Sequence, residues 1–102
     1  MNITKTNDNG SITLALDGWL DTASSPELAA QIEAIDSANA IVLDFCGVEY
    51  IASSGIRQVV ACNKRAKEIG AEFSVINVGT DVMSIFQLTG LDKKLTIIGQ
   101  AH

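Results

Sequence analysis

The sequence contains no apolar run long enough to cross a membrane. No segment approaches the ~20 consecutive apolar residues that a helical span needs, and Met1–Lys5 lacks the basic start and apolar core of a secretory signal. Apolar residues make up 47% of the 102-residue chain, as in an ordinary globular protein. We therefore expect a cytoplasmic protein that forms one domain over residues 1–102 and has no membrane partner.

Histidine, cysteine and basic residues are also scarce, and each scarcity argues against a class of site. The single histidine, His102, is the last residue and would be a poorly fixed anchor for a catalytic triad or a metal. Cys46 and Cys62 have neither metal-type nor redox-type spacing, so we expect both to be small apolar fillers. A net charge of −5 without a basic stripe argues against nucleic-acid binding. The sequence thus predicts no metal, no cofactor and no direct nucleic-acid contact.

The stretch from Ala40 to Gly70 organises the rest of the chain. Ala40–Phe45 is almost entirely apolar and too short for a helix, which predicts a buried parallel strand. A loop is expected over Cys46–Ile51, followed by a helix that begins at Ser53 and stops at Gly70. The predicted inner face of that helix consists of Val59, Cys62, Ala66 and Ile69.

The N-terminal part of the chain has the pattern of a hairpin followed by a helix. Alternating apolar residues predict two strands, Asn2–Thr6 and Ser11–Asp17, after which Gly18–Asp21 is expected to leave the sheet. Ser25 is expected to cap a helix that ends near residues 37–39.

The C-terminal part continues the alternation of strand and helix. We expect a strand over Glu72–Val78, a short helix capped by Thr80 or Asp81 that stops at Gly90, and an edge strand over Leu95–Ile98. This order of elements predicts an α/β fold, in which helices flank a small mixed β-sheet. The sheet combines an N-terminal antiparallel hairpin with parallel βαβ crossovers.

Three polar side chains are candidates for chemistry. Ala52–Gly55 has one glycine and no following lysine, so a nucleotide cradle of the P-loop kind is not indicated. Asp21 and Asp44 could lie near Ser53 at one end of the sheet, as in a small hydrolase, but no histidine or lysine is placed to activate the serine. The alternative is that the two carboxylates accept hydrogen bonds from loop amides or helix starts. The sequence therefore argues against an enzyme.

Ser53 has two possible roles at the start of its helix. Its hydroxyl could cap the backbone amides, as serine commonly does. It could instead accept a phosphate, because the start of a helix favours negative charge. The residues alone leave both roles open.

Four segments match one known family: Leu16–Asp21, Pro26–Leu28, Ile41–Arg57 and Leu88–Leu91. Through them the chain resembles STAS-domain proteins of the anti-anti-sigma type, the bacterial anti-sigma factor antagonists. In that family, the serine at the position of Ser53 is phosphorylated by an anti-sigma factor that is itself a serine kinase. The unphosphorylated antagonist binds this kinase and frees the sigma factor, and a phosphoserine phosphatase resets it.

The resemblance implies a role for each matching residue. Ser53 would be the phosphoacceptor, with ATP bound to the partner kinase rather than to this chain. The implied partner-binding surface consists of Asp21, Asp44, Ser53, Ser54, Gly55 and Arg57. One residue departs from the family pattern, since Ala52 stands where many members have an acidic residue. Other STAS domains act without phosphorylation, as scaffolds or lipid-transporter subunits, and this is the alternative function; a small hydrolase or nucleotide-binding protein is a third.

Overall fold

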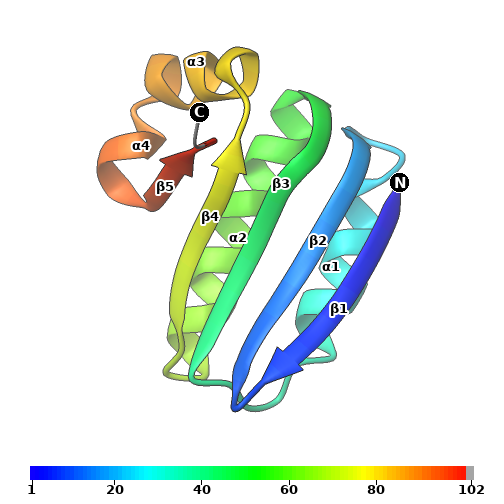
Figure 1. Cartoon of the computed structure of the whole chain (residues 1–102), viewed down its shortest axis with the longest axis vertical. Coiled ribbons are helices and arrows are strands. Elements are labelled where there is room, and N and C mark those ends of the chain that lie inside the picture. The colour runs from blue at the N-terminus through cyan, green and yellow to red at the C-terminus, as the bar shows by residue number, and fades with distance from the viewer. Residues whose placement is uncertain (101–102) are drawn as a thin grey trace.

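The structure, a computed structural model, describes residues 1–100 of the chain, so the prediction for His102 lies outside the described residues. Five strands form one sheet in the order β1-β2-β3-β4-β5 (Figure 1). The strands are β1 (Asn2–Asp8), β2 (Ser11–Leu20), β3 (Ala40–Ile51), β4 (Glu72–Val78) and β5 (Thr96–Gly99). β1 and β2 are antiparallel, and every other neighbouring pair is parallel. The predicted mixed α/β fold is confirmed.

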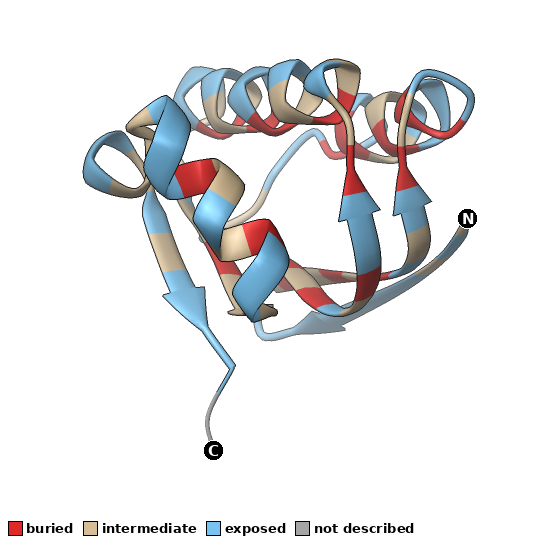
Figure 2. Cartoon of the chain, turned by 90° about the horizontal axis from the view of Figure 1, so that it is seen from above, coloured by how far each residue is buried: buried red, intermediate tan, exposed pale blue. Residues whose placement is uncertain are grey.

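Helices cover one face of the sheet and leave much of the other face open. The helices are α1 (Ser25–Glu33), α2 (Ser53–Glu68), α3 (Thr80–Thr89) and α4 (Leu91–Lys94). α1 and α2 lie side by side over the sheet, while α3 and α4 lie toward β5 (Figures 1 and 2). Figure 2 shows the buried residues gathered on the sides of the strands and helices that face each other.

The core follows the alternation that the sequence predicts. Ile12, Leu14 and Leu16 of β2 are buried, as are the alternate residues of β3. The predicted inner face of α2 is confirmed at Val59 and Ala66, which are fully buried.

The two cysteines differ, and the prediction that both are apolar fillers is wrong for one of them. Cys62 is fully buried on α2, and burial raises the pKa of its thiol to about 12. Cys46 is exposed. It follows the buried Phe45 on β3, so strand alternation places its side chain on the face without helices.

β2 and β3 are both longer than the sequence predicts. β2 continues to Leu20 instead of leaving the sheet at Gly18, and β3 continues through Cys46–Ile51, which was expected to be a loop. Register shifts beside Gly18 and Gly47 keep the two strands paired as far as Leu20 with Ile51. The glycines therefore lie within a bulged ladder and do not end it.

α1 begins and ends differently from the prediction. Ser24, not Ser25, precedes its first residue, and the Ser25 hydroxyl donates a hydrogen bond to the Asp21 carbonyl at 2.6 Å. The helix stops at Glu33, several residues before the expected end. Tertiary contacts explain this stop, because Arg65 of α2 donates a hydrogen bond to the Ile35 carbonyl at 3.0 Å and so holds the chain as it turns toward β3.

The C-terminal elements lie close to their predicted positions. β4 has the predicted bounds, and β5 lies one residue further along than Leu95–Ile98. Gly79, and not Thr80 or Asp81, precedes α3. Gly90 ends α3 with a positive φ of 76°, as predicted for a helix stop.

Candidate functional site

Ser53 is the first residue of α2 and is exposed. The preceding residue, Ala52, is extended, with φ −92° and ψ 171°. In the described part of the chain, no side-chain hydrogen bond caps the start of this helix. The capping role, one of the two that the sequence leaves open for Ser53, is therefore not seen at this helix start, and the Ser53 hydroxyl is accessible to a partner protein beside backbone amides that favour negative charge.

Gly55 allows α2 to begin directly against β2. A Cβ atom on Gly55 would meet the Leu20 carbonyl oxygen, and it would lie 2.9 Å from side-chain carbons of Leu20 and Ile51. Real Cβ atoms essentially never approach other atoms so closely, so any larger residue would push the helix away. Gly55 thereby fixes the position of Ser53, two residues earlier.

Two hydrogen bonds hold the turn after β2 to the start of α2. The Ala52 N–H donates to the Leu20 carbonyl at 2.9 Å. The Thr22 hydroxyl donates to the Ser54 hydroxyl oxygen at 3.1 Å. Ser54 is half-buried and so differs from the exposed Ser53 beside it.

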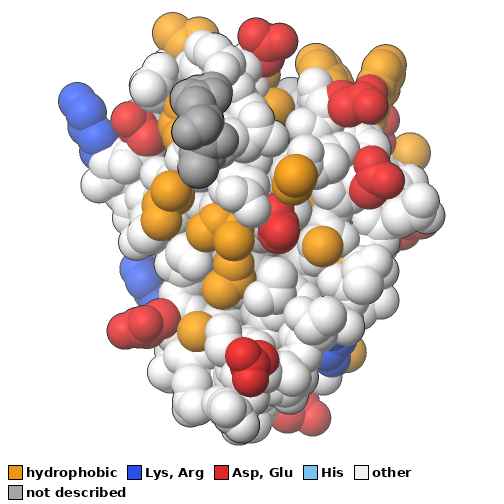
Figure 3. Space-filling model, viewed as in Figure 1, with side chains coloured by type: hydrophobic (Ala, Val, Ile, Leu, Met, Phe, Trp, Pro, Cys, Tyr) orange, Lys and Arg blue, Asp and Glu red, His pale blue; other side chains and the backbone are white. Residues whose placement is uncertain are grey.

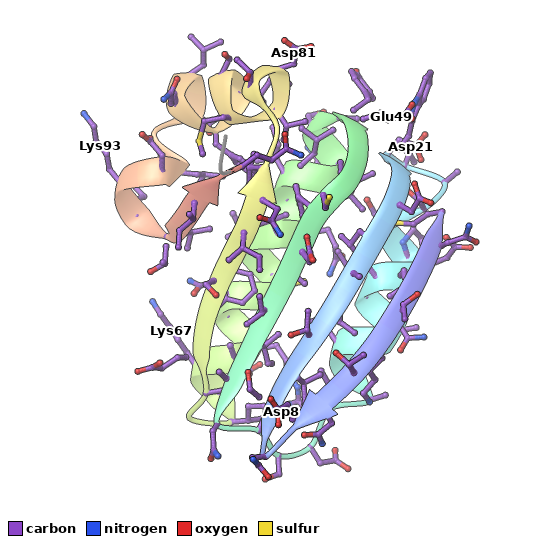
Figure 4. The ribbon with its side chains drawn as sticks, in the orientation of Figure 1. Asp8, Asp21, Glu49, Lys67, Asp81 and Lys93 are labelled. Atoms are coloured by element: carbon purple, nitrogen blue, oxygen red, sulfur yellow. The ribbon has the colours of Figure 1, made fainter. Side chains whose placement is uncertain are left out.

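Asp21 organises that turn. Its Oδ1 accepts hydrogen bonds from the backbone N–H groups of Ala23 and Ser24, both at 3.1 Å. The Ser24 N–H is the main cause that lowers the pKa of the Asp21 carboxyl below its ordinary value of 3.8. The Ser24 hydroxyl in turn donates to the Trp19 carbonyl at 2.6 Å. Figure 4 shows Asp21 at the carboxyl end of β2, so the structure brings it to the end of the sheet from which α2 begins.

Asp44 does not lie at that end of the sheet. It pairs with Ile76 in the interior of β3, roughly 20 Å along the strand from Ile51 at ~3.3 Å per residue. Its Oδ1 accepts hydrogen bonds from the Cys46 N–H at 2.9 Å and from the Asn77 side-chain amide at 3.1 Å. Both carboxylates therefore accept hydrogen bonds from nearby amides, which is the alternative that the sequence left open. A partner-binding role for Asp44 stays a prediction.

Arg57 lies four residues after Ser53 and is exposed. Residues four apart share one face of a helix, so a charge on Ser53 would have this guanidinium as its neighbour. The partner-binding role predicted for Arg57 also stays a prediction.

An exposed aromatic pair that was not predicted from the sequence lies beside the turn. Trp19 and Tyr50 lie opposite each other on β2 and β3, with ring centroids 5.4 Å apart. No local signal could have found this pair, because Trp19 meets Tyr50 only through the register shift that follows Gly18.

The fold and the site define a small α/β protein that presents a serine at the start of a helix. The family model described as "Mlab, STAS domain" matches residues 3–99. The chain therefore belongs to the STAS domain family, and the predicted resemblance is confirmed.

Relatives carry names that match this family. The anti-sigma-F factor antagonist RsfB of Mycobacterium tuberculosis is 28% identical over 102 residues, which cover 98% of this chain and 83% of RsfB. The crystal structure of an anti-sigma factor antagonist from Mycobacterium paratuberculosis has a TM-score of 0.85 and 26% identity, covering 95% of this chain and 84% of that one. The phosphorylated form of the Bacillus cell fate determinant SpoIIAA has a TM-score of 0.74 at 17% identity, with coverage of 94% and 90%, and shares the fold.

Residues 1–100 contain neither a membrane-spanning helix nor a metal-type cluster of side chains. Their helices include none with the length and apolar character of a membrane span. Their His, Cys, Asp and Glu side chains form no group of three or more that could hold a metal ion.

Proposed function

We propose that this chain, acting as one STAS domain in the cytoplasm, is an anti-sigma factor antagonist that works by binding and not by catalysis. Its unphosphorylated form binds a kinase-type anti-sigma factor, which releases the sigma factor. Phosphorylation of Ser53 ends the binding, and a phosphoserine phosphatase restores it. The observation that carries the proposal is the exposed, uncapped Ser53 at the first position of α2.

The chemistry of a phosphate at this position suits a switch. It adds a charge of about −1.5 to −2 and three acceptor oxygens at one point of the surface. The amides at the start of α2 tolerate that charge within this chain. At the interface, the same dianion facing acidic or apolar groups of the partner would oppose binding, and a loss of ~4 kcal/mol would weaken binding about a thousandfold.

The surrounding residues have positioning and contact roles in this proposal. Gly55 and Ser54 fix the start of α2, while Asp21 shapes the turn beside it. Arg57 extends the docking surface along α2. Asp44 would contribute only if the partner also reaches the open face of the sheet.

The test is to incubate the protein with the cognate kinase and ATP and to map phosphate by mass spectrometry. Ser53→Ala should incorporate no phosphate and keep partner binding, while Ser53→Asp should bind more weakly. Ser54→Ala is the matched control, because it removes the adjacent, half-buried hydroxyl and should leave phosphorylation of Ser53 in place. Phosphate mapped to another residue, or undiminished binding of Ser53→Asp, would contradict the switch.

One observation favours a second candidate, a STAS scaffold or lipid-transporter subunit that works without phosphorylation. Ala52 precedes the acceptor and offers a kinase no carboxylate. Stable association with transporter subunits, together with no phosphate on Ser53 after incubation with the kinase, would support this candidate.

A further inference from the structure

Trp19 and Tyr50 form an aromatic surface that the fold itself leaves without a partner. Their side chains are 57% and 47% exposed, and the two rings are tilted by 57°. Most large apolar side chains of the sheet point into the core, whereas these two stand together at its carboxyl end. Exposed aromatic pairs of this kind are typical anchors of protein interfaces.

The backbone under the pair is held firmly. Trp19 pairs with Tyr50, and the next pair along, Leu20 with Ile51, is buried in the core. The Trp19 carbonyl also accepts the hydrogen bond from Ser24 that ties it to the Asp21 turn. A rigid backbone lowers the conformational entropy lost on binding, so the aromatic surface is preorganised for a partner.

A register shift brings a carboxylate to the same place. Gly18 pairs with Val48 but Trp19 pairs with Tyr50, so Glu49 is the extra residue of a β-bulge. Glu49 is exposed, and Figure 4 shows it with Asp21 at the ends of β3 and β2. The space-filling view shows acidic and hydrophobic side chains gathered together at this end of the molecule (Figure 3).

Trp19 and Tyr50 both belong to a long stretch of sequence whose charged residues are all acidic. Residues 6–56 contain eight Asp or Glu residues and no Lys or Arg. Two of these carboxylates, those of Asp21 and Glu49, lie at the carboxyl ends of β2 and β3, where the aromatic rings also lie, whereas Asp8 lies at the opposite end of the sheet (Figure 4). A partner that is complementary to this surface must bring positive charge.

We propose that Trp19 and Tyr50, flanked by Asp21 and Glu49, form an aromatic anchor that receives a basic side chain of the anti-sigma factor. Arginine fits best, because its planar guanidinium can stack on an aromatic ring while it pairs with a carboxylate. This inference rests on the proposed function and adds the point of attachment. Tyr50 is three residues before Ser53, so the anchor would dock the partner beside the phosphoacceptor.

The test compares the dissociation constant of the kinase complex for matched variants. Trp19→Ala should weaken binding about 30-fold, equivalent to ~2 kcal/mol at 1.4 kcal/mol per factor of ten. Ile98→Ala is the control, since Ile98 is 54% exposed on β5 at the opposite edge of the sheet, and its binding should stay within twofold of wild type. Glu49→Gln should weaken binding less and should reduce its dependence on salt. Far-UV circular dichroism and thermal unfolding verify that each variant is folded.

Fluorescence gives a second readout. Trp19 is the only tryptophan of the chain, so binding should change its emission, and the change should disappear in Trp19→Phe. Equal binding of Trp19→Ala and Ile98→Ala to a kinase that binds wild type would overturn the aromatic anchor and leave the proposed function standing. If wild type itself neither binds the kinase nor accepts phosphate, both fail together.

Discussion

Asp21 shows how one side chain can shape a site without being its reactive group. Its carboxylate accepts two backbone N–H groups of its own turn, and the Ser24 hydroxyl links that turn to the Trp19 carbonyl. The turn then contacts the start of α2 through the Thr22 and Ser54 hydroxyls. Ser53 and Trp19 are therefore positioned from the same four-residue segment after β2, residues 21–24.

This arrangement predicts a specific acid response. Hydrogen bonds to the Asp21 carboxylate, chiefly from the Ser24 N–H, lower its pKa in the folded state. Folding therefore favours the charged form of Asp21. The stabilisation is present above the ordinary pKa of 3.8 and is lost as the pH falls below it. We expect Asp21→Asn, measured by urea unfolding at pH 7 and pH 3, to lose less stability on acidification than wild type. An identical loss in both proteins would show that Asp21 does not contribute to the acid response.

Single residues also mark the limit of prediction from sequence. Ser53 could be singled out because a serine at a helix start has a recognisable local role, whereas Gly55 was named only through the resemblance to STAS proteins. The Trp19–Tyr50 pair could not be singled out, because it depends on a register shift between strands far apart in sequence. Asp44 was placed wrongly for a related reason, since its position relative to Ser53 depends on where β3 ends.

At the scale of elements, the close approach of α2 to β2 predicts the effect of one methyl group. Gly55→Ala places a Cβ atom against the Leu20 carbonyl oxygen and the Leu20 and Ile51 side chains. Overpacking of this kind costs typically ~1–3 kcal/mol, and ~2 kcal/mol corresponds to a fall in Tm of about 10 °C for a chain of this size.

Gly79→Ala is the matched control for this experiment. Gly79 also precedes a helix, α3, but among residues 1–100 a Cβ atom there would have only Gln100 Oε1 nearby, at 3.9 Å. Its Tm should fall by less than half as much as that of Gly55→Ala, because exchanging glycine for alanine at a helix N-cap costs less than the ~1 kcal/mol typical of losing a full cap. Equal losses in the two variants, measured by thermal unfolding, would contradict the steric argument.

Element type was predictable here, but several element ends were not. Alternating and helical apolar patterns predict all five strands and the three longer helices, because burial of one face imposes these periods. The ends of β2 and β3 were missed because Gly18 and Gly47 resemble strand ends, although they are accommodated at register shifts. The early end of α1 depends on Arg65, a residue of another helix that binds the Ile35 carbonyl.

At the scale of the whole molecule, topology determines which residues meet. β2, β3 and β4 are parallel, so their carboxyl ends lie at one end of the sheet, and the segments that follow them start there (Figure 1). The order of elements in the sequence was sufficient to predict that Asp21 and Ser53 share this end. The order of elements does not show on which face of the sheet a side chain lies, because that depends on the strand register. The register places Asp44 on the open face.

The same architecture predicts that phosphorylation changes the surface of the molecule and not its fold. Ser53 is exposed and caps nothing, so a phosphate displaces no packed side chain and breaks no capping bond. The amides at the start of α2 and the guanidinium of Arg57 on the same helix face both favour the added negative charge. The core beneath α2, including Val59 and Ala66, remains covered.

Hydrogen exchange of the phosphorylated and unphosphorylated protein tests this expectation. Amides in the interior of β3 and α2 should keep their protection, and those of the first turn of α2 should gain some, since the phosphate accepts their hydrogen bonds. The free energy of unfolding should change by no more than ~1 kcal/mol, the usual size of a helix-dipole interaction. Loss of protection across β3 or α2 would mean that the phosphate acts by loosening the fold. With protection unchanged, any loss of partner binding must come from the charge itself at the docking surface.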